Sequence, residues 1–345
     1  MSPLPQVLRG YAALTAKSRL EPVALPLGEP RPYEVIIAIE ACGVCHSDVH
    51  LIDDDWGMSQ YPLVPGHEIL GRIVQAGADV PASHAVGTYV GVGWQRGACG
   101  RCPACLSQRD NLCATSRATC VGWHGGYADL HRTGWQYAFV MPASLQRPEA
   151  APLLCAGLTV FSPLQAYLPA SGGKVGIVGL GGLGHLAVRL AVALGHTVTV
   201  FTSSASKQAS ALAAGASQVV DSADAAAIVA AAGDQLDLVL VTAAADLPWA
   251  AYIDTLAADG TLCFVGIPPQ PISLNVGQLL NKRRKIVASP IGNRQTMIDL
   301  LALCDQHQIV AQTEQFALAD VNTALDRVRT NQVRYRAVLV RQDKA

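Results

Sequence analysis

Four cysteines gathered in one short stretch are the residues whose types and spacing point most directly to chemistry. Cys99, Cys102 and Cys105 follow one another at intervals of three in CGRCPACLSQRDNLC, and Cys113 returns after seven intervening residues. Four thiolates at this spacing can close a tetrahedron around one Zn²⁺. A closed four-thiolate shell has no open position, so we expect a structural zinc site. Four ordinary reduced cysteines in a loop are the alternative, but cysteines rarely cluster this densely.

A second set of metal-binding residue types is dispersed along the chain. Cys45 lies in CGVCHSDVH, His67 in VPGHEILG and Cys155 in APLLCAGLTVFSPL. Two thiolates and an imidazole make a three-ligand zinc site whose fourth position is open to water or to a substrate oxygen. Taken singly, each of these residues could be structural, because buried thiols and hydrogen-bonded histidines are common in protein cores.

A glycine-rich turn between a predicted strand and a predicted helix indicates a dinucleotide site. The strand KVGIV runs into Gly179, Leu180, Gly181, Gly182, Leu183 and Gly184, and a helical pattern follows. In a GxGxxG turn the first glycine makes the bend, the second lets the backbone approach a pyrophosphate, and the third lets helix and strand pack closely. A glycine-rich turn without a ligand is the alternative.

The end of the next predicted strand, HTVTVF, favours NADP(H) over NAD(H). An acidic residue is expected there if the cofactor's ribose carries free hydroxyls. The chain instead has Thr202, Ser203 and Ser204, with Lys207 one helical turn further on. Hydroxyls and a cation suit a 2′-phosphate, whereas a carboxylate would repel it. Serine and threonine are also common helix caps, so a simple cap is the competing interpretation.

The elements that must position these residues fall into two regions. From Val23 to about Met141 the sequence is rich in glycine, proline and short β-branched runs, which predicts a strand-and-turn domain. From Pro152 to about Ser289 apolar strands alternate with alanine-rich helical stretches, which predicts a parallel sheet of βαβ units. The tail from Ile291 reads as helix, strand, helix and strand, and should pack back onto the first domain. We therefore expect one domain from residues 1–151 and 290–345, and a second from residues 152–289.

Composition excludes partners chosen by bulk charge. Half of the 345 residues are hydrophobic, and 25 basic residues stand against 26 acidic ones. A formal net charge of −1 attracts neither nucleic acid nor an anionic membrane. The N-terminus lacks the pattern of a secretory signal, and no apolar run is long and uncharged enough to span a bilayer. We expect a cytoplasmic protein in a reducing compartment, where ten cysteines remain free thiols.

Motifs distributed along nearly the whole chain carry a family resemblance. They are CGVCHSD, YPLVPGHEILG, GVGWQRGACGRCPAC, HGGYAD, APLLCAGLTVFSPL, GLGGLGHLAVRLA and SPIGNRQTMIDLL, in this order. The chain resembles the zinc-dependent medium-chain alcohol dehydrogenases, specifically their cinnamyl alcohol dehydrogenase-type, NADP-dependent branch. The resemblance implies an α/β protein, with a GroES-like, mostly-β catalytic domain and a Rossmann coenzyme domain with a doubly wound parallel sheet.

The resemblance also implies roles for individual residues. Cys45, His67 and Cys155 match the catalytic zinc ligands, and the four clustered cysteines match the structural zinc site. Asp48 would orient His67 from outside the ligand shell, and Glu68 would lie close to the metal. Ser47 and His50 match the positions of a proton relay. The family places a pyrophosphate contact at the position of His46 and substrate-pocket residues at the positions of Trp94, Trp56 and Met58.

The expected activity is hydride transfer between NADP(H) and primary alcohols or aldehydes, with two zinc ions per chain. Aromatic or medium-sized apolar substrates suit a wall of aromatic and sulfur-containing side chains. A polyol or sugar dehydrogenase is the nearest alternative enzyme. A silent NADPH-binding protein should have lost a ligand, and a nucleic-acid-binding zinc ribbon should carry a basic face. Similarity also implies a homodimer or homotetramer.

Several features receive no functional role. The segment DLHRTGWQYAFVMP departs from the family pattern, so the edge of the pocket is undefined. Buried thiols are expected at the four remaining cysteines, Cys42, Cys120, Cys263 and Cys304. The basic run Lys282, Arg283, Arg284 and Lys285 is expected to be a solvated connection.

Overall fold

The computed structural model describes residues 7–341 and divides into two compact units, Met1–Cys155 with Asn293–Ala345, and Ala156–Gly292. Both boundaries lie a few residues beyond the predicted ones. The reason at the first boundary is the short helix η5 (Pro148–Leu154), which packs against strands β3 (Glu34–Val44), β4 (Ile69–Ala76), β5 (Tyr89–Val92) and β17 (Arg336–Val340). Cys155, at the end of η5, therefore belongs to the first unit and not to the second.

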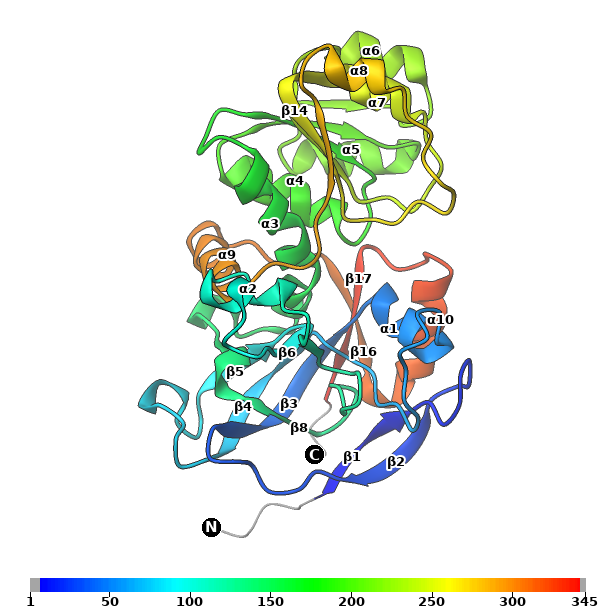
Figure 1. Cartoon of the computed structure of the whole chain (residues 1–345). Coiled ribbons are helices and arrows are strands. Elements are labelled where there is room, and N and C mark those ends of the chain that lie inside the picture. The colour runs from blue at the N-terminus through cyan, green and yellow to red at the C-terminus, as the bar shows by residue number, and fades with distance from the viewer. Residues whose placement is uncertain (1–6, 342–345) are drawn as a thin grey trace. The chain divides into compact units, whose positions relative to one another are not determined.

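A seven-stranded sheet forms the centre of the first unit. Its order is β16 (Thr313–Ala317), β17, β3, β4, β5 and β9 (Phe139–Val140), and β8 (Leu130–Gly134) pairs with the first half of β3. The pairing of β17 with Ala41–Val44 is antiparallel, and β16 runs parallel to β17. The last strand of the chain therefore lies inside this sheet, as the red β17 in Figure 1 shows.

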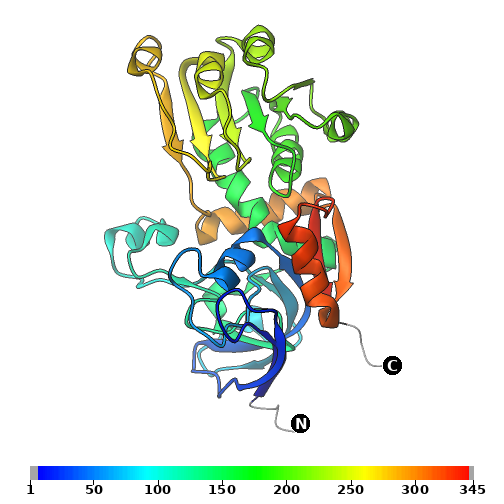
Figure 2. The same ribbon diagram turned by 90° about the vertical axis from the view of Figure 1, so that its right-hand side faces the viewer.

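Smaller elements complete the first unit. The strands β1 (Val7–Ala12) and β2 (Glu21–Pro26) form an antiparallel pair, and so do β6 (Gln95–Gly97) and β7 (Arg117–Ala118). Helix α1 (His46–Asp53) lies beside α10 (Val321–Arg329) in both views (Figures 1 and 2). The remaining elements are η1 (Ala82–His84), α2 (Pro103–Leu106), η2 (Asp110–Leu112), η3 (Trp135–Tyr137), η4 (Ala143–Leu145), α9 (Arg294–His307) and η6 (Leu318–Asp320).

The second unit is a parallel six-stranded sheet with helices on both faces, as expected for a doubly wound fold. Its strand order is β12 (Gln218–Val220), β11 (Thr197–Phe201), β10 (Lys174–Val178), β13 (Leu236–Val241), β14 (Leu256–Phe264) and β15 (Lys285–Ala288). The helices are α3 (Ala156–Tyr167), α4 (Gly184–Ala193), α5 (Ala205–Ala213), α6 (Ala225–Ala232), α7 (Trp249–Thr255) and α8 (Val276–Leu280). The predicted fold class is confirmed.

Burial explains why strands of the two units have different sequence patterns. In β10, β11 and β13 nearly every side chain is buried, because helices cover both faces, so these strands are continuous apolar runs. By contrast, β2 lies at the surface and alternates between exposed and partly buried side chains. Within residues 7–341, no single helix is long and apolar enough to cross a bilayer; η5 and α3 reach that length only as a pair bent by 49°.

The basic run Lys282–Lys285 corrects one expectation. The Arg284 guanidinium is only 4% exposed and pairs with Asp234 at 2.6 Å and Asp254 at 3.3 Å, while its Nε donates to the Leu256 carbonyl. Lys282 also pairs with Asp234, and Arg283 pairs with Asp259. Ion pairs from this run therefore connect the start of β15 to earlier segments of the second unit. The prediction of a solvated connection was wrong for Arg284.

Candidate functional site

The first unit brings Cys45, His67, Glu68 and Cys155 together in one buried group. One donor atom from each residue lies within 4.8 Å of the others. Cys45 ends β3 and caps α1, His67 and Glu68 immediately precede β4, and Cys155 follows η5. The His67 Nε2 atom lies 3.2 Å from the Cys155 sulfur. Two thiolates and an imidazole at this separation form a donor set that fits one tetrahedral Zn²⁺.

Asp48 fixes the orientation of this group. Its carboxylate is fully buried and accepts hydrogen bonds from the backbone amides of Cys45 (2.9 Å) and Gly66 (3.0 Å) and from the Tyr127 hydroxyl (3.1 Å). His67 Nδ1 lies 2.8 Å from the same carboxylate. The proton of His67 is therefore held on Nδ1, and the Nε2 lone pair faces the two sulfurs. This is the position predicted for Asp48.

Glu68 lies at the same centre, with its carboxylate completely buried. One oxygen accepts a hydrogen bond from Arg336 of β17, and the other has no partner among the described residues. Burial raises the pKa of Glu68 to about 7, against the opposing charge of Arg336. The oxygen without a partner is a further donor available to a metal.

The two predicted relay residues lie on α1. Ser47 is partly buried, and His50 is partly exposed, with its Nδ1 2.8 Å from the Asp55 carboxylate. His50 also contacts Trp56, with a distance of 5.1 Å between ring centroids. The Asp55 carboxylate therefore orients the His50 ring through Nδ1. His46 is exposed on the same helix.

Aromatic side chains form a wall beside the metal-binding group. Trp94 meets the His67 ring edge-on at 4.9 Å, and Trp56 meets Trp94 edge-on at 6.1 Å. Trp56 and Met58 are 41% and 40% exposed, whereas Trp94 is mostly covered. The structure thus brings both tryptophans together next to His67. It leaves Met58 at the surface.

The four clustered cysteines form a second group in the loop around α2 and η2. Their sulfur atoms all lie within 4.8 Å of one another, with Cys99 and Cys105 separated by 3.9 Å and Cys102 and Cys105 by 3.6 Å. The edge of a tetrahedron with Zn–S bonds near 2.3 Å is about 3.8 Å. The donor set therefore fits a closed zinc site.

The glycine turn of the second unit has the geometry that its sequence predicts. Gly179 adopts a φ of +91°, and a Cβ on Gly184 would lie 2.0 Å from the Gly179 carbonyl oxygen. A Cβ on Gly181 would meet nothing within 4 Å. Gly184 is therefore needed for packing, while Gly181 leaves open space where a pyrophosphate can approach. Gly182 and Leu183 complete the turn, and Leu183 caps α4.

The segment after β11 lies next to this turn, because β10 and β11 are neighbours and the Gly179 amide donates to the Phe201 carbonyl at 2.8 Å. Thr202 is buried, Ser203 is exposed, and Ser204 precedes α5 without capping it through its side chain. Lys207 lies in the first turn of α5. The Ser204 side chain does not cap the helix, so the cap interpretation is not supported. The Ser204 hydroxyl lies 3.0 Å from that of Ser206, and Thr202 Oγ1 accepts a hydrogen bond from the Ser204 amide.

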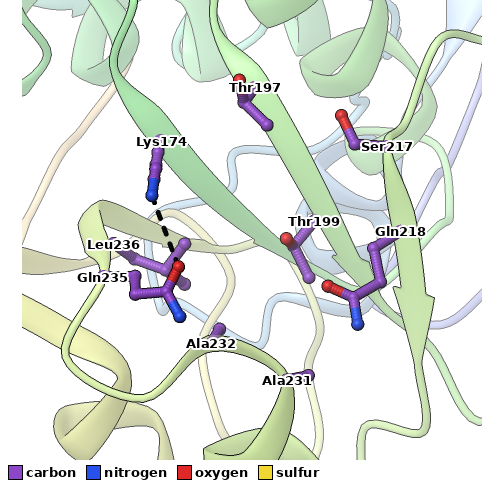
Figure 3. Close-up of a pocket in the computed structure, with 9 residues that line it drawn as sticks. All are labelled: Lys174, Thr197, Thr199, Ser217, Gln218, Ala231, Ala232, Gln235 and Leu236. Carbon is purple, nitrogen blue, oxygen red and sulfur yellow. Dashed lines mark hydrogen bonds between the residues drawn. The ribbon is translucent and has the colours of Figure 1, made fainter.

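A separate cavity of about 270 Å³ lies at the opposite end of the same strands (Figure 3). Lys174, Thr197, Gln218 and Leu236 line it, and they are the first residues of β10, β11, β12 and β13. Since the glycine turn follows the carboxyl end of β10, this cavity is distinct from the dinucleotide site.

Sequence reasoning missed three residues of the metal centre. Arg336, Tyr127 and Asp55 contact Glu68, Asp48 and His50, respectively. Only Asp55, five residues after His50, had a local signal, since the other two partners are distant in sequence. The four unassigned cysteines, Cys42, Cys120, Cys263 and Cys304, are all buried, as expected.

Comparison with protein families agrees with the geometry. Residues 31–143 match the model described as an alcohol dehydrogenase GroES-like domain, and residues 182–306 match the model described as a zinc-binding dehydrogenase. The first match contains Cys45, His67 and the four clustered cysteines, and it ends before Cys155. The second match contains strands β11 to β15 of the parallel sheet.

Similar proteins cover almost the full chain. Aldehyde reductase AdhA of Synechocystis is 41% identical over 96% of this chain and 98% of its own length. A probable cinnamyl alcohol dehydrogenase of Zea mays is 37% identical over 96% of this chain and 92% of its own length. A solved cinnamyl alcohol dehydrogenase from Sorghum bicolor superposes with a TM-score of 0.91 at 34% identity, covering 97% of both chains. One from Helicobacter pylori, solved in complex with NADP(H), gives a TM-score of 0.86 at 29% identity, covering 97% of this chain and 98% of its own.

Proposed function

This chain belongs to the zinc-binding alcohol dehydrogenase family of alcohol and aldehyde oxidoreductases, and we propose that it reduces aromatic or medium-sized apolar aldehydes with NADPH. The observation that carries this proposal is the aromatic wall formed by Trp94 and Trp56 directly beside His67. A flat apolar substrate with a carbonyl group can lie against such a wall while its oxygen faces the metal-binding residues.

Cys45, His67 and Cys155 would hold the catalytic zinc, and Glu68 would stand ready as an additional donor. Zinc in this position supplies Lewis acidity, which polarises a carbonyl oxygen. Asp48 keeps His67 in the tautomer that can bind metal, with help from Tyr127 and two backbone amides. Burial of the whole group keeps water away from the charges and strengthens their interactions.

The product alcohol needs one proton, and α1 carries the residues that can supply it. Ser47 has a hydroxyl able to donate to the nascent alcohol, and His50 can replace the proton from bulk solvent. His50 Nδ1 lies 2.8 Å from the Asp55 carboxylate, which holds the ring in one orientation. Because His50 is partly exposed, its other nitrogen can exchange protons with water.

The glycine turn would bind the cofactor pyrophosphate, and Thr202, Ser203, Ser204 and Lys207 would bind its 2′-phosphate. This assignment rests on the open space at Gly181 and on the absence of an acidic side chain at residues 202–204. NADPH supplies the hydride. We also propose His46 as a cofactor contact, on the basis of its exposure on the first turn of α1.

The first test is the initial rate of cinnamaldehyde reduction with NADPH and with NADH under identical conditions. We expect strong preference for NADPH. Lys207→Ala should raise KM for NADPH about tenfold, as expected for the loss of one charge-assisted hydrogen bond, and should leave KM for NADH unchanged. Lys174→Ala serves as the matched control, because Lys174 is an exposed lysine at the other end of β10.

Each result of this test has a distinct meaning. Equal effects of Lys207→Ala on both cofactors would refute the 2′-phosphate role. Turnover with short aliphatic or polyol substrates, without turnover of cinnamaldehyde, would refute the aromatic substrate class and leave the zinc dehydrogenase assignment in place.

We further propose that the protein is a homodimer or homotetramer assembled through the β15 edge of the parallel sheet. β15 is the last strand of its sheet, and the segment that leads into it exposes Ile267 (76%), Val276 (63%) and Leu280 (76%). Apolar side chains this exposed beside an unpaired strand edge support association with a second copy. Ten free thiols support a cytoplasmic location.

A further inference from the structure

A group of arginines surrounds Trp123 in the first unit, and two of them, Arg96 and Arg117, flank the four-cysteine loop in the sequence. The Cζ atom of Arg96, on β6, lies 4.2 Å from the centroid of the Trp123 ring, and that of Arg132, on β8, lies 4.7 Å from it. The indole Nε1 donates to the Arg132 carbonyl at 2.9 Å, which fixes the ring. Stacking on Trp123 holds both guanidinium groups in place. Arg132 also donates a hydrogen bond to the Glu29 carbonyl at 2.6 Å, whereas the Nε atom of Arg96 has no partner among the described residues.

Two further arginines surround this pair. Arg117 on β7 pairs with Gly97 in the strand register, and its guanidinium covers that glycine, since a Cβ there would lie 2.9 Å from Arg117 Nε. Arg31 precedes β3, and its charge acts on Arg96 together with those of Arg117 and Arg132. We call Arg31, Arg96, Arg117 and Arg132 the arginine cluster.

Negative charge in this neighbourhood is scarce. Glu34 lies 3.5 Å from Arg132 and also accepts a hydrogen bond from the Arg31 amide. Among residues 7–341, Arg96 forms no ion pair, and its Nε atom is buried without a hydrogen-bond partner. Because Glu34 pairs with Arg132, the Arg96 guanidinium is left without a counter-charge of its own among the described residues. Burying part of a guanidinium group without a counter-charge is unfavourable unless an anion or a water molecule accepts its hydrogen bonds.

His131 is a second buried side chain near Arg96 with a nitrogen atom that has no hydrogen-bond partner among the described residues. Its ring is 1% exposed, its Nδ1 lies 3.1 Å from the His124 carbonyl, and its Nε2 has no partner within the described chain. Arg96 lies on β6 and His131 on β8, and these two strands are in contact. Arg96 Nε offers a donor and His131 Nε2 an acceptor. A hydrogen phosphate or a carboxylic acid group carries both complementary functions.

We propose that the arginine cluster is an oxyanion-binding site, which takes the phosphate or carboxylate group of a small molecule. Arginine suits this role because its planar fork of N–H groups matches the paired oxygens of both groups. The ligand would accept hydrogen bonds from Arg117 and from Arg96, including its buried Nε, and would donate a hydrogen bond to His131 Nε2. This site is independent of the predicted 2′-phosphate contacts, which lie in the other unit.

The test is isothermal titration of the zinc-loaded, full-length protein with inorganic phosphate, and separately with succinate, at constant ionic strength. Saturating NADPH is present, so that the predicted 2′-phosphate site is occupied. We expect saturable binding of at least one of the two anions. Arg96→Gln should weaken it by about tenfold or more, which corresponds to loss of one charge-assisted pair of hydrogen bonds.

Two additional variants keep the test decisive if Arg96→Gln fails to fold. Arg117→Gln removes an exposed member of the cluster and should also weaken binding, whereas Arg9→Gln, an exposed arginine on β1, should not. Lys207→Ala should leave phosphate binding intact, which separates this site from the cofactor site. Absence of saturable binding of both anions, or equal affinity in wild type, Arg96→Gln and Arg117→Gln, would overturn the proposal.

Discussion

At the scale of single residues, the buried donors around His67 depend on one another. Asp48 receives four hydrogen-bond donors from three separate segments, and His67 can offer Nε2 to a metal only while Asp48 holds Nδ1. A change in any donor residue therefore alters metal binding before it alters the fold.

Cys155→Ser tests this centre directly. Serine has nearly the same volume as cysteine but binds zinc poorly, so we expect zinc content to fall from two ions per chain to one and turnover to be lost. The melting temperature should change little, because the structural zinc group is intact. Elemental analysis together with initial rates checks the prediction, and Cys304→Ser, at a buried cysteine outside both groups, is the control. Retention of both zinc ions and of turnover would contradict the assignment.

His131 provides a pH-dependent contribution to stability. Burial, together with the positive charge of Arg96, lowers the pKa of His131 to about 3, so the folded protein keeps the ring neutral. The unfolded chain binds this proton below about pH 6.5, the ordinary value for histidine. Between about pH 6.5 and pH 3 the unfolded state holds one more proton, and stability falls on acidification by about 1.4 kcal/mol per pH unit from this group.

His131→Asn removes that contribution while it keeps an N–H donor for the His124 carbonyl. Urea unfolding in phosphate-free buffer between pH 6.5 and pH 5 should show a shallower loss of stability in the variant than in wild type. Acid effects on the zinc sites are common to both proteins and cancel in the difference. Parallel curves would mean that His131 does not titrate as a buried neutral ring.

At the scale of elements, the glycine turn separates packing from ligand binding. Gly184→Val would place side-chain atoms against the Gly179 carbonyl, 2.0 Å from the Cβ position, and we expect a loss of about 3 kcal/mol or more in the stability of the second unit. Gly181→Val enters open space, so thermal stability should be retained while KM for NADPH rises at least about tenfold.

Thermal denaturation and NADPH titration of both variants check this pair of expectations. If Gly181→Val unfolds the protein, or if it binds NADPH as tightly as wild type, the space beside Gly181 is not the pyrophosphate site.

Sequence patterns predicted most elements of the second unit, because strands buried on both faces are continuous apolar runs and their helices have clear boundaries. Spacing is a local signal for the group of four clustered cysteines, whereas Cys45, His67 and Cys155 are dispersed along the chain and were assigned through the family resemblance. The structure brings the members of each set together. Contacts between distant segments could not be read in this way. Arg336 reaches Glu68 across 268 positions, and Arg284 is buried because of Asp234 and Asp254, not because of its own neighbours.

At the scale of the whole molecule, the exposed apolar residues before β15 predict the state of association. Leu280→Asp places a charge on a 76% exposed position of α8, and if the proposed oligomer forms through this edge, the substitution should convert it to smaller species, down to the 36.2 kDa monomer. Light scattering coupled to size exclusion measures this mass. Leu212→Asp is the matched control, because Leu212 is also exposed but lies on α5. An unchanged mass in Leu280→Asp would exclude the β15 edge as the interface.

The position of β17 inside the first sheet also has a consequence for biosynthesis. The part of β3 that leads to Cys45 pairs on one side with residues 337–340, so that side stays an open strand edge until these residues have been synthesised. The second unit is continuous from Ala156 to Gly292 and can fold while the chain is still being synthesised. The segment that contains β17 then completes the pairing of β3 and brings Arg336 to Glu68. A nascent chain stalled before residue 336 therefore carries every zinc-ligand candidate and a complete parallel sheet, yet lacks the strand and the cation that finish the metal centre.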